Sequence, residues 1–185
     1  GFAAGVYMRG IPFIQIPTTF LAAVDSSVGG KTAVDLKNGK NLAGLFHQPS
    51  LVITDVDAFQ TLSPENYACG SAESIKMGVI SDPVLFDIFE NGNPKEQEAE
   101  IVCRAVQAKA DIVERDERET GDRKLLNLGH TYGHAVEKLS GFTLPHGHAV
   151  AVGLAMAARA AEKMGDMTKE TKDRILNTLI NNDLP

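Results

Sequence analysis

Asn127-Leu128-Gly129-His130-Thr131-Tyr132-Gly133-His134 is the stretch on which the predicted fold is centred. On a helix of 3.6 residues per turn, a residue meets its neighbours three, four and seven positions away on one face. Such a face would carry four polar side chains, those of Arg123, Asn127, His130 and His134. Burying polar groups without partners costs roughly 1–3 kcal/mol each. We therefore expect a polar ligand at this face and interpret it as a metal ion with an anionic substrate.

Four of the five histidines lie between positions 130 and 148, because Pro145-His146-Gly147-His148 follows closely. An isolated histidine is often a hydrogen-bonded core residue, but this clustering favours a metal site. Two histidines four residues apart, such as His130 and His134, have the spacing of zinc-binding helices. A third ligand from another segment would leave a coordination position open for water or substrate. Spacing alone therefore predicts that both helix histidines are ligands.

The chain has 185 residues, of which 43% are hydrophobic and 23% charged, and this predicts a globular protein with one substantial core or two small ones. Its formal net charge of −6 argues against a surface that binds nucleic acid or an anionic membrane. Its apolar runs are shorter than the roughly 20 residues that span a bilayer, and the given residues show no basic-then-apolar pattern of a signal segment. Cys69 and Cys103 show no CxxC spacing, so we expect no disulfide, no thiolate metal site and a cytoplasmic location.

Both ends of the chain lie next to expected secondary structure. The chain begins with Gly1 inside a helix-like run rich in glycine and alanine, and it stops at Pro185 directly after a helical pattern. We therefore expect it to be a piece of a longer protein, whose function is incomplete in this piece.

Residues 1–60 have the pattern of an α/β domain. We expect strands at 11–16 and 51–54, with the turn Pro17-Thr18-Thr19 leading into a helix at 20–24. Between the strands we expect loops at 25–32 and 38–41, whose amides, hydroxyls and lysines suit phosphate groups. Gly30-Lys31-Thr32 does not complete a P-loop, because that motif needs glycine where this chain has Asp25.

Residues 61–185 have mainly helical patterns. Ser63 and Pro64 suit the start of a helix to residue 80, and further helices are expected at 83–90, 96–117, 147–164 and 169–181. Glu73 and Lys76 lie one turn apart and could form a solvated ion pair worth a few tenths of a kcal/mol. Their apolar neighbours leave little room for an exposed face, which favours a buried role. The charged run 114–119 should be mostly solvated surface.

Nine motifs in sequence order resemble the 3-dehydroquinate synthase family. They are Tyr7-Met8-Arg9-Gly10-Ile11, Pro17-Thr18-Thr19, Asp25-Ser26-Ser27-Val28-Gly29-Gly30-Lys31-Thr32, Gly39-Lys40-Asn41, Ala72-Glu73-Ser74-Ile75-Lys76, Lys109, Glu119-Thr120-Gly121-Asp122-Arg123, 126–134 and His146-Gly147. The likeness runs from Gly1 to at least Gly153. It implies the C-terminal part of an NAD-binding α/β domain at 1–60, followed by a mainly α-helical metal- and substrate-binding domain at 61–185.

Members of this family convert 3-deoxy-D-arabino-heptulosonate 7-phosphate to 3-dehydroquinate and phosphate. This phosphate-eliminating lyase reaction belongs to the shikimate pathway of aromatic amino acid biosynthesis and uses NAD with a divalent metal, usually zinc or cobalt. A Lewis acid polarises the hydroxyl that loses hydride, cations hold the substrate's phosphate and carboxylate, and the nicotinamide stays bound because the hydride returns.

The resemblance assigns a role to each matching residue. The implied metal ligands are Glu73, His130 and His146, which differs from the spacing argument because His134 is then not a ligand. The implied phosphate contacts are Lys31, Asn41, Lys76, Asn127 and His134, and the implied carboxylate contacts are Lys109 and Arg123. Asp25 and Glu119 would orient hydroxyls or basic side chains. The implied NAD contacts are Thr18, Thr19, Lys31, Lys40, Asn41, Phe59, Thr61 and Leu62. Arg9 would reach the phosphate site of a neighbouring subunit, which implies a homodimer.

Two departures from the family pattern matter. His148 stands where the family usually has glutamate, two residues after the third ligand, and this affects the surroundings of that ligand. The glycine-rich turn for the pyrophosphate and a last catalytic lysine would lie outside the chain. We therefore expect this chain alone to bind metal, to bind NAD poorly and not to turn over.

Three alternatives remain open at this point. The first is a polyol dehydrogenase of the glycerol dehydrogenase kind, although a neutral polyol gives Lys76, Lys109 and Arg123 nothing to neutralise. The second is another sugar-phosphate cyclase that makes a cyclitol. The third is a non-enzymatic helical interaction module with an incidental metal site.

Overall fold

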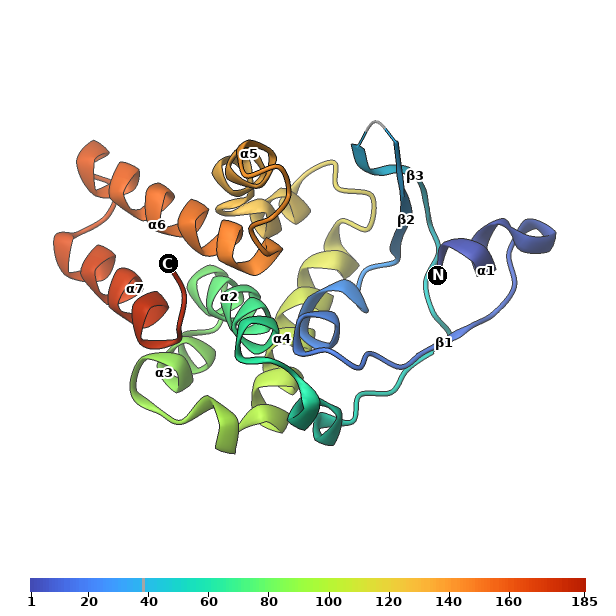
Figure 1. Cartoon of the computed structure of the whole chain (residues 1–185), viewed down its shortest axis with the longest axis horizontal. Coiled ribbons are helices and arrows are strands. Elements are labelled where there is room, and N and C mark those ends of the chain that lie inside the picture. The colour runs from blue at the N-terminus through green and yellow to red at the C-terminus, as the bar shows by residue number, and fades with distance from the viewer. Residues whose placement is uncertain (38) are drawn as a thin grey trace.

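The computed structural model describes residues 1–37 and 39–185, and Figure 1 shows a mixed N-terminal part joined to a helical part. The N-terminal part consists of α1 (Phe2–Val6), β1 (Ile14–Gln15), β2 (Lys31–Leu36), β3 (Gly39–Phe46) and β4 (Leu51–Val52), with 3₁₀ segments at Tyr7–Arg9 and Val56–Thr61 and a π-helical segment at Ala22–Ser26. The helical part consists of α2 (Pro64–Ile80), α3 (Pro83–Asn91), α4 (Glu98–Arg115), α5 (His130–Leu139), α6 (His146–Met164) and α7 (Lys169–Asn181), with 3₁₀ segments at Pro94–Glu96 and Asp122–Asn127.

The helices of the second part begin close to the predicted positions. Ser63 caps α2 by accepting a hydrogen bond from the backbone N–H of Asn66, and Asp82 caps α3 through the N–H groups of Val84 and Leu85. Proline occupies the first position of both helices, where its missing N–H costs no helical hydrogen bond. The expected fold class, a short α/β part followed by a mainly helical part, is therefore confirmed.

The N-terminal part differs from the prediction in one element. Lys31 and Thr32 and residues 39–41, which were predicted to lie in loops, belong to strands, because β2 and β3 form an antiparallel hairpin in which Thr32 faces Leu45. Lys31, Lys40 and Asn41 therefore lie on strands, while Asn38 lies outside the described residues. The polar residues around the glycines resembled loop composition, but the two strands pair the backbone groups on their facing edges. β1 pairs in parallel with β4, so the two predicted strands exist but are short.

The predicted helix face from Arg123 to His134 is also wrong. Residues 122–127 form a 3₁₀ segment, and α5 begins only at His130. Gly129 between them has a φ of 79°, in the left-handed region that glycine adopts without strain. Arg123 therefore does not share a helix face with the two histidines.

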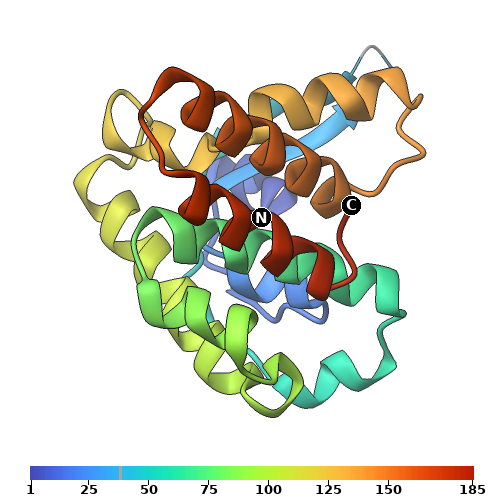
Figure 2. The same ribbon diagram turned by 90° about the vertical axis from the view of Figure 1, so that its left-hand side faces the viewer.

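The core of the helical part is built around α2. Figures 1 and 2 show α3, α4 and α6 around this helix, with α5 lying on α6 and α7 between α6 and α3. The large buried core side chains include Phe20, Ile75, Leu85, Ile101, Ile112, Leu154 and Leu179. Most of α2, from Ala68 to Gly78, is buried, so polar side chains on this helix face other protein groups.

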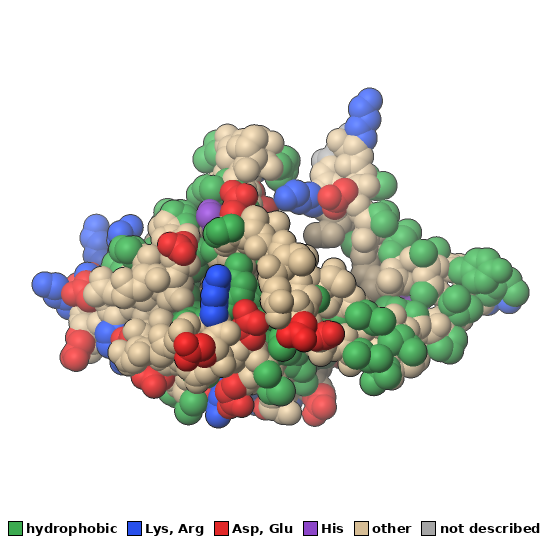
Figure 3. Space-filling model, turned by 60° about the horizontal axis from the view of Figure 1, so that its bottom comes forward, with side chains coloured by type: hydrophobic (Ala, Val, Ile, Leu, Met, Phe, Trp, Pro, Cys, Tyr) green, Lys and Arg blue, Asp and Glu red, His purple; other side chains and the backbone are tan. Residues whose placement is uncertain are grey.

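The N-terminal part keeps many apolar side chains at the surface. Figure 3 shows hydrophobic side chains gathered over this part, at the right of the view, whereas charged side chains spread over the helical part. The exposed apolar residues of this part include Val6, Tyr7, Met8, Ile11, Ile14, Ile16, Leu51 and Ile53. Among residues 1–37 and 39–185, no helix combines the length and the apolar character needed to cross a membrane.

Gly153 tests the close packing of α5 on α6. A Cβ atom at this position would lie 1.9 Å from the carbonyl oxygen of Gly129. Alanine is a better helix former than glycine by about 1 kcal/mol, but overpacking against backbone costs about 1–3 kcal/mol or more. We expect Gly153→Ala to lower the free energy of unfolding in urea, whereas Leu139→Ala, at an exposed position of α5, should leave it nearly unchanged. A more stable Gly153→Ala chain would contradict this packing.

Candidate metal and substrate site

Glu73, His130 and His146 meet where three helices converge. Glu73 lies on α2, and the two histidines are the first residues of α5 and α6. Oε1 of Glu73 is 3.6 Å from Nε2 of His130 and 3.3 Å from Nε2 of His146. One ligand atom from each residue lies within 4.8 Å of the other two, a spacing that can hold a metal ion.

The Glu73 carboxylate is the least solvated member of this group. Its side chain is 1% exposed, and within the described part of the chain neither oxygen has a hydrogen bond of good geometry. A buried carboxylate needs opposite charge or coordination, and binding a metal is one of the ways in which proteins satisfy it. One carboxylate and two imidazoles are a common ligand set of catalytic zinc, with a position left open. The residues present therefore fit a divalent cation.

The local charges keep these groups in forms that suit a metal. Burial opposes ionisation of Glu73, but the ammonium of Lys76 at 2.5 Å, together with His146 and His130, holds the pKa of Glu73 well below its usual range. Burial lowers the pKa of His130, which favours the neutral imidazole that binds metals. The contact with Glu73 raises the pKa of His146, so a metal would compete with a proton there.

His134 occupies a different position from the one that spacing predicted. Its ring centroid is 5.3 Å from that of His130 and 6.0 Å from that of His146. Its ligand atoms, however, group with Glu137 and His146 instead of Glu73. His134 is exposed on α5, beside the three-residue group.

Gly147 explains how His146 comes so close to α2. A Cβ atom at Gly147 would lie 2.3 Å from the Cα atom of Cys69, so only glycine fits this contact. Cys69 lies one turn before Glu73 on α2. The glycine after the histidine therefore allows the start of α6 to reach the carboxylate.

A cavity of about 660 Å³ lies beside hairpin β2–β3, and its volume is typical of small-molecule sites. The charged and amide side chains that line it are Asp25, Lys31, Asn41, Lys109 and Arg123. Nζ of Lys109 lies 2.9 Å from Oδ1 of Asp25 and also donates to the carbonyl of that residue, at 2.5 Å. Burial opposes the charge of Lys76, but Glu73 and, to a smaller extent, Asp25 raise the pKa of Lys76. Of the seven residues predicted to hold the phosphate or the carboxylate, four line this cavity, whereas Lys76, Asn127 and His134 are not among its lining residues.

Arg123 is buried at the wall of this cavity. Its guanidinium donates to the carbonyl of Gly29 at 2.7 Å and to the carbonyl of Glu117, and it lies 5.8 Å from the Phe46 ring. It therefore joins the segment before β2 to the loop after α4, a role that the helix-face prediction did not include.

Residues 116–121 form a loop that carries Glu119 to the same region. Glu119 pairs with Lys31 and accepts a hydrogen bond from Asn127 at 2.9 Å. Burial opposes ionisation of Glu119, but these partners lower its pKa. The carboxylate of Asp116 accepts hydrogen bonds from the backbone N–H groups of Thr120, Gly121 and Arg123. These three hydrogen bonds hold the loop closed.

The predicted NAD contacts lie on the N-terminal part. Thr18 and Thr19 are exposed after β1, and Lys40 pairs with Glu137 at 3.1 Å. Phe59 is 3% exposed and packs on Phe20, so its ring offers no surface to a cofactor. Thr61 is exposed and Leu62 is partly buried. Asn41 has a φ of 55° and donates its N–H to Asp35. Arg9, which was predicted to reach a neighbouring subunit, is exposed at the end of the 3₁₀ segment Tyr7–Arg9.

Glu137 is a buried residue of the site that sequence reasoning missed. Its carboxylate lies 3.5 Å from Nδ1 of His146. Positions 130, 134 and 137 share one face of α5, because they are separated by four and three residues. This spacing was visible in the sequence and could have identified Glu137.

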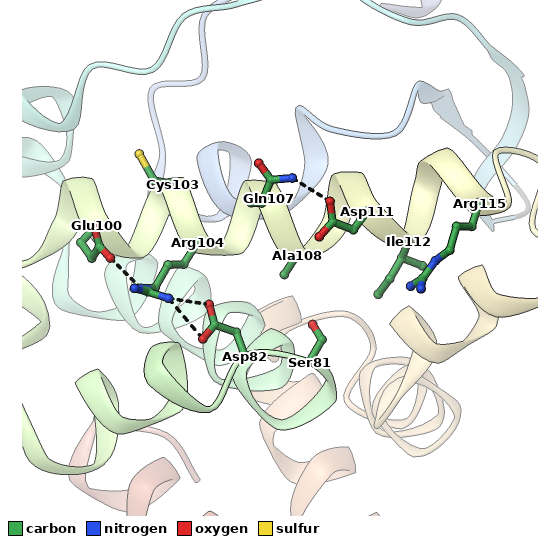
Figure 4. Close-up of a pocket in the computed structure, with 10 residues that line it drawn as sticks. All are labelled: Ser81, Asp82, Glu100, Cys103, Arg104, Gln107, Ala108, Asp111, Ile112 and Arg115. Carbon is green, nitrogen blue, oxygen red and sulfur yellow. Dashed lines mark hydrogen bonds and ion pairs between the residues drawn. The ribbon is translucent and has the colours of Figure 1, made fainter.

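A second groove, of about 550 Å³, runs along α4 at the turn between α2 and α3 (Figure 4). Arg104 crosses it to Asp82 and also pairs with Glu100, while Gln107 donates to Asp111. Its charged groups therefore largely satisfy one another. It contains none of the residues predicted to bind metal or substrate.

Comparisons with known proteins identify relatives of both parts. Residues 70–185 match the family described as 3-dehydroquinate synthase C-terminal, and residues 1–69 match the family described as 3-dehydroquinate synthase N-terminal. The 3-dehydroquinate synthases of Bradyrhizobium diazoefficiens and Geobacter metallireducens are each 48% identical over the whole chain. The chain covers 50% and 53% of their lengths, so it spans about half of the curated relatives that it matches.

Solved structures share the same fold. ValA, the 2-epi-5-epi-valiolone synthase of Streptomyces hygroscopicus with NAD+ and Zn2+ bound, has a TM-score of 0.93 and 30% identity. The match covers 100% of this chain and 54% of ValA. A 2-deoxy-scyllo-inosose synthase complexed with carbaglucose-6-phosphate, NAD+ and Co2+ has a TM-score of 0.84 and 32% identity, and covers 98% of this chain and 51% of that protein.

Asp116 gives the site a testable dependence on pH. Backbone N–H donors, with that of Thr120 the strongest, lower the pKa of Asp116 from 3.8 to about 2. A carboxyl group whose pKa is lower in the folded than in the unfolded chain stabilises the fold at any pH above its unfolded pKa. This stabilisation is lost as the pH falls towards the folded pKa. We expect Asp116→Asn to have a lower free energy of unfolding in urea than the unchanged chain at neutral pH. This difference in free energy should disappear between about pH 4 and pH 2. Asp166→Asn, an exposed control, should follow the unchanged chain, and a difference independent of pH would contradict the role of the carboxylate.

Proposed function

The chain belongs to the 3-dehydroquinate synthase family, and from this premise we propose that it forms about half of an enzyme that converts 3-deoxy-D-arabino-heptulosonate 7-phosphate to 3-dehydroquinate and phosphate. The observation that carries the proposal is the meeting of Glu73, His130 and His146 in a chain that also has a cavity lined by Lys31, Lys109 and Arg123. The enzyme is then a phosphate-eliminating lyase of the shikimate pathway, which leads to aromatic amino acids.

The proposed cofactors are NAD and a divalent metal, zinc or cobalt, which Glu73, His130 and His146 would hold. When bound, the metal would polarise a substrate hydroxyl and NAD would accept and return hydride. The ValA structure holds NAD+ and Zn2+, and the 2-deoxy-scyllo-inosose synthase structure holds NAD+ and Co2+, which supports this choice. The buried and poorly bonded carboxylate of Glu73 supports it independently.

The cations beside the metal group suit a substrate with two anionic groups. We assign the phosphate to Lys31, Asn41, Lys76, Asn127 and His134, and the carboxylate to Lys109 and Arg123. Carboxylates now neutralise three of these cations, because Glu73 pairs with Lys76, Glu119 with Lys31, and Asp25 with Lys109. Substrate anions would share these cations with Asp25 and Glu119, which would then keep the ammonium groups in place.

The N-terminal part suits one side of a nucleotide site. Thr18 and Thr19 follow β1, and ligands of parallel sheets bind beyond the carboxyl ends of the strands. Lys31, Lys40, Asn41, Thr61 and Leu62 complete the proposed NAD contacts, and Phe59 contributes only through its backbone. The exposed apolar side chains around β1 and β4 support further nucleotide-domain structure packing there in the complete protein.

The complete protein is proposed to be a cytoplasmic homodimer. Arg9 is exposed at the end of the 3₁₀ segment Tyr7–Arg9, from which it could reach the phosphate site of a neighbouring subunit. Cys69 and Cys103 are both free thiols, which suits a reducing compartment.

A second candidate is a cyclase for another phosphorylated sugar, which the TM-score of 0.93 to ValA favours. Lys109 and Arg123 argue for a substrate with a carboxylate, and the relatives at 48% identity are 3-dehydroquinate synthases. A polyol dehydrogenase is disfavoured, because a neutral polyol leaves the cavity cations without an anion.

Single substitutions test the ligand set. We expect Glu73→Gln, His130→Ala and His146→Ala each to weaken Zn²⁺ binding by at least about 100-fold, because each removes one of three protein ligands. His134→Ala should retain nearly full affinity. Calorimetric titration of the 185-residue chain measures this, and loss of binding on His134→Ala with retention on Glu73→Gln would instead support the ligands predicted from spacing.

Activity can be tested in a hybrid enzyme. Residues 1–185 would replace the matching segment of the Geobacter metallireducens relative, to which they are 48% identical. We expect the hybrid to release phosphate from 3-deoxy-D-arabino-heptulosonate 7-phosphate without net NADH formation, and Lys76→Met to lower kcat on the order of 100-fold. A folded, zinc-loaded hybrid that forms net NADH from glycerol, or that accepts only sugar phosphates without a carboxylate, would contradict the proposal.

A further inference from the structure

We propose that Glu137, held in place by Lys40, positions the imidazole of His146 for the metal and thereby links hairpin β2–β3 to the metal site. Glu137 and Lys40 would act through His146 without touching the metal. The inference rests on the metal site proposed above and adds to it two positioning residues.

The imidazole of His146 lies between two carboxylates. Its Nε2 is 3.3 Å from Oε1 of Glu73, and its Nδ1 is 3.5 Å from Oε2 of Glu137. A histidine that binds metal through one nitrogen usually donates its other N–H to a carboxylate, carbonyl or water, which fixes its tautomer and orientation. With Nε2 directed to the metal, Glu137 is the acceptor that faces Nδ1–H.

The histidine at the neighbouring ligand position has a different partner. Nδ1 of His130 lies 3.2 Å from the backbone carbonyl of Leu128, so its ring is oriented by the chain just before α5. Both imidazoles therefore present Nε2 to Glu73, but only His146 depends on a side chain for its orientation. A substitution can remove that partner without changing the backbone.

Glu137 itself is held from the N-terminal part. Its side chain is 4% exposed, and Nζ of Lys40 lies 3.1 Å from its Oε1. Lys40 comes from β3, and its ammonium also lies 4.7 Å from the centre of the Phe142 ring, just after α5. A carboxylate this deeply buried needs a compensating cation. Lys40 supplies it.

This contact connects the substrate cavity with the metal group. Lys40 is adjacent in β3 to Asn41, which lines the cavity, and β2 contributes Lys31 to the same wall. A movement of the hairpin would therefore displace the cation that holds Glu137. The orientation of His146 is then coupled to the position of the hairpin.

His134, Glu137 and His146 could alternatively bind a metal of their own, because their ligand atoms lie close enough together. The ammonium of Lys40 occupies Oε1 of Glu137 and would repel a second cation at the same carboxylate. His146 would also have to serve both ions. The geometry therefore favours a positioning role over a second metal site.

Co²⁺ titration of the 185-residue chain, followed by visible absorption, tests the role of Glu137. We expect Glu137→Ala to weaken Co²⁺ binding by about 10–100-fold and to change the shape of the absorption bands, because His146 loses its orientation. Glu137→Gln keeps an oxygen that can accept from Nδ1–H and should recover part of the affinity. Glu114→Ala, an exposed control on α4, should match the unchanged chain. Near-ultraviolet circular dichroism checks that each variant is folded, and the isosteric Glu137→Gln carries the test if the alanine variant is not.

A double-mutant cycle tests the link to the hairpin. Lys40→Met should weaken Co²⁺ binding in the unchanged chain but add little in the Glu137→Ala background, because its effect passes through Glu137. Lys37→Met, in the turn of the same hairpin, is the matched control. Additive effects of Lys40→Met and Glu137→Ala would overturn the link.

The remaining outcomes separate this inference from the proposed function. If the unchanged chain binds no Co²⁺, the proposed metal site fails, and the inference fails with it. If the unchanged chain binds one equivalent and Glu137→Ala binds it equally well with the same spectrum, only the inference fails. A second equivalent that disappears in both His134→Ala and Glu137→Ala would replace positioning by a second metal site.

Discussion

The burial of the Glu73 carboxylate is the constraint around which the site is organised. A charge removed from water needs opposite charge or metal coordination, and breaking such a buried pair costs about 3–5 kcal/mol. Lys76 supplies one partner from the same helix, and His130 and His146 approach from the starts of two others. Small residues make this convergence possible, because a side chain at Gly147 would collide with the backbone of α2.

Charged side chains between the metal group and the hairpin also have partners of opposite charge. Lys31, Lys40 and Lys109 each pair with a carboxylate from a segment far away in sequence, and Arg123 reaches the carbonyl of Gly29. These contacts join the N-terminal part to the helical part through polar groups around the cavity. At the cavity, Lys31 and Lys109 are therefore already paired with carboxylates, whereas Arg123 donates to backbone carbonyls. A substrate anion would have to share or replace these partners.

The sequence predicted those features that depend on local signals. Ser63 and Asp82 mark helix starts, and the motifs around Glu73, His130 and His146 implied the group that the structure brings together. Features that depend on distant contacts were missed or misjudged. The left-handed conformation of Gly129, which separates the 3₁₀ segment from α5, depends on the fit of this glycine against α6. The hairpin depends on strand pairing, which its polar composition did not indicate. The spacing of Glu137 from His130 was visible in the sequence, but its partners Lys40 and His146 come from β3 and α6 and were not.

Anomalous diffraction at the zinc absorption edge, from crystals of the 185-residue chain grown with equimolar zinc, tests the central claim most directly. We expect one strong peak within coordination distance, about 2.0–2.2 Å, of a Glu73 oxygen and of Nε2 of both His130 and His146. A peak bounded by His134 and Glu137 in place of Glu73, or zinc found only at the molecular surface, would contradict it.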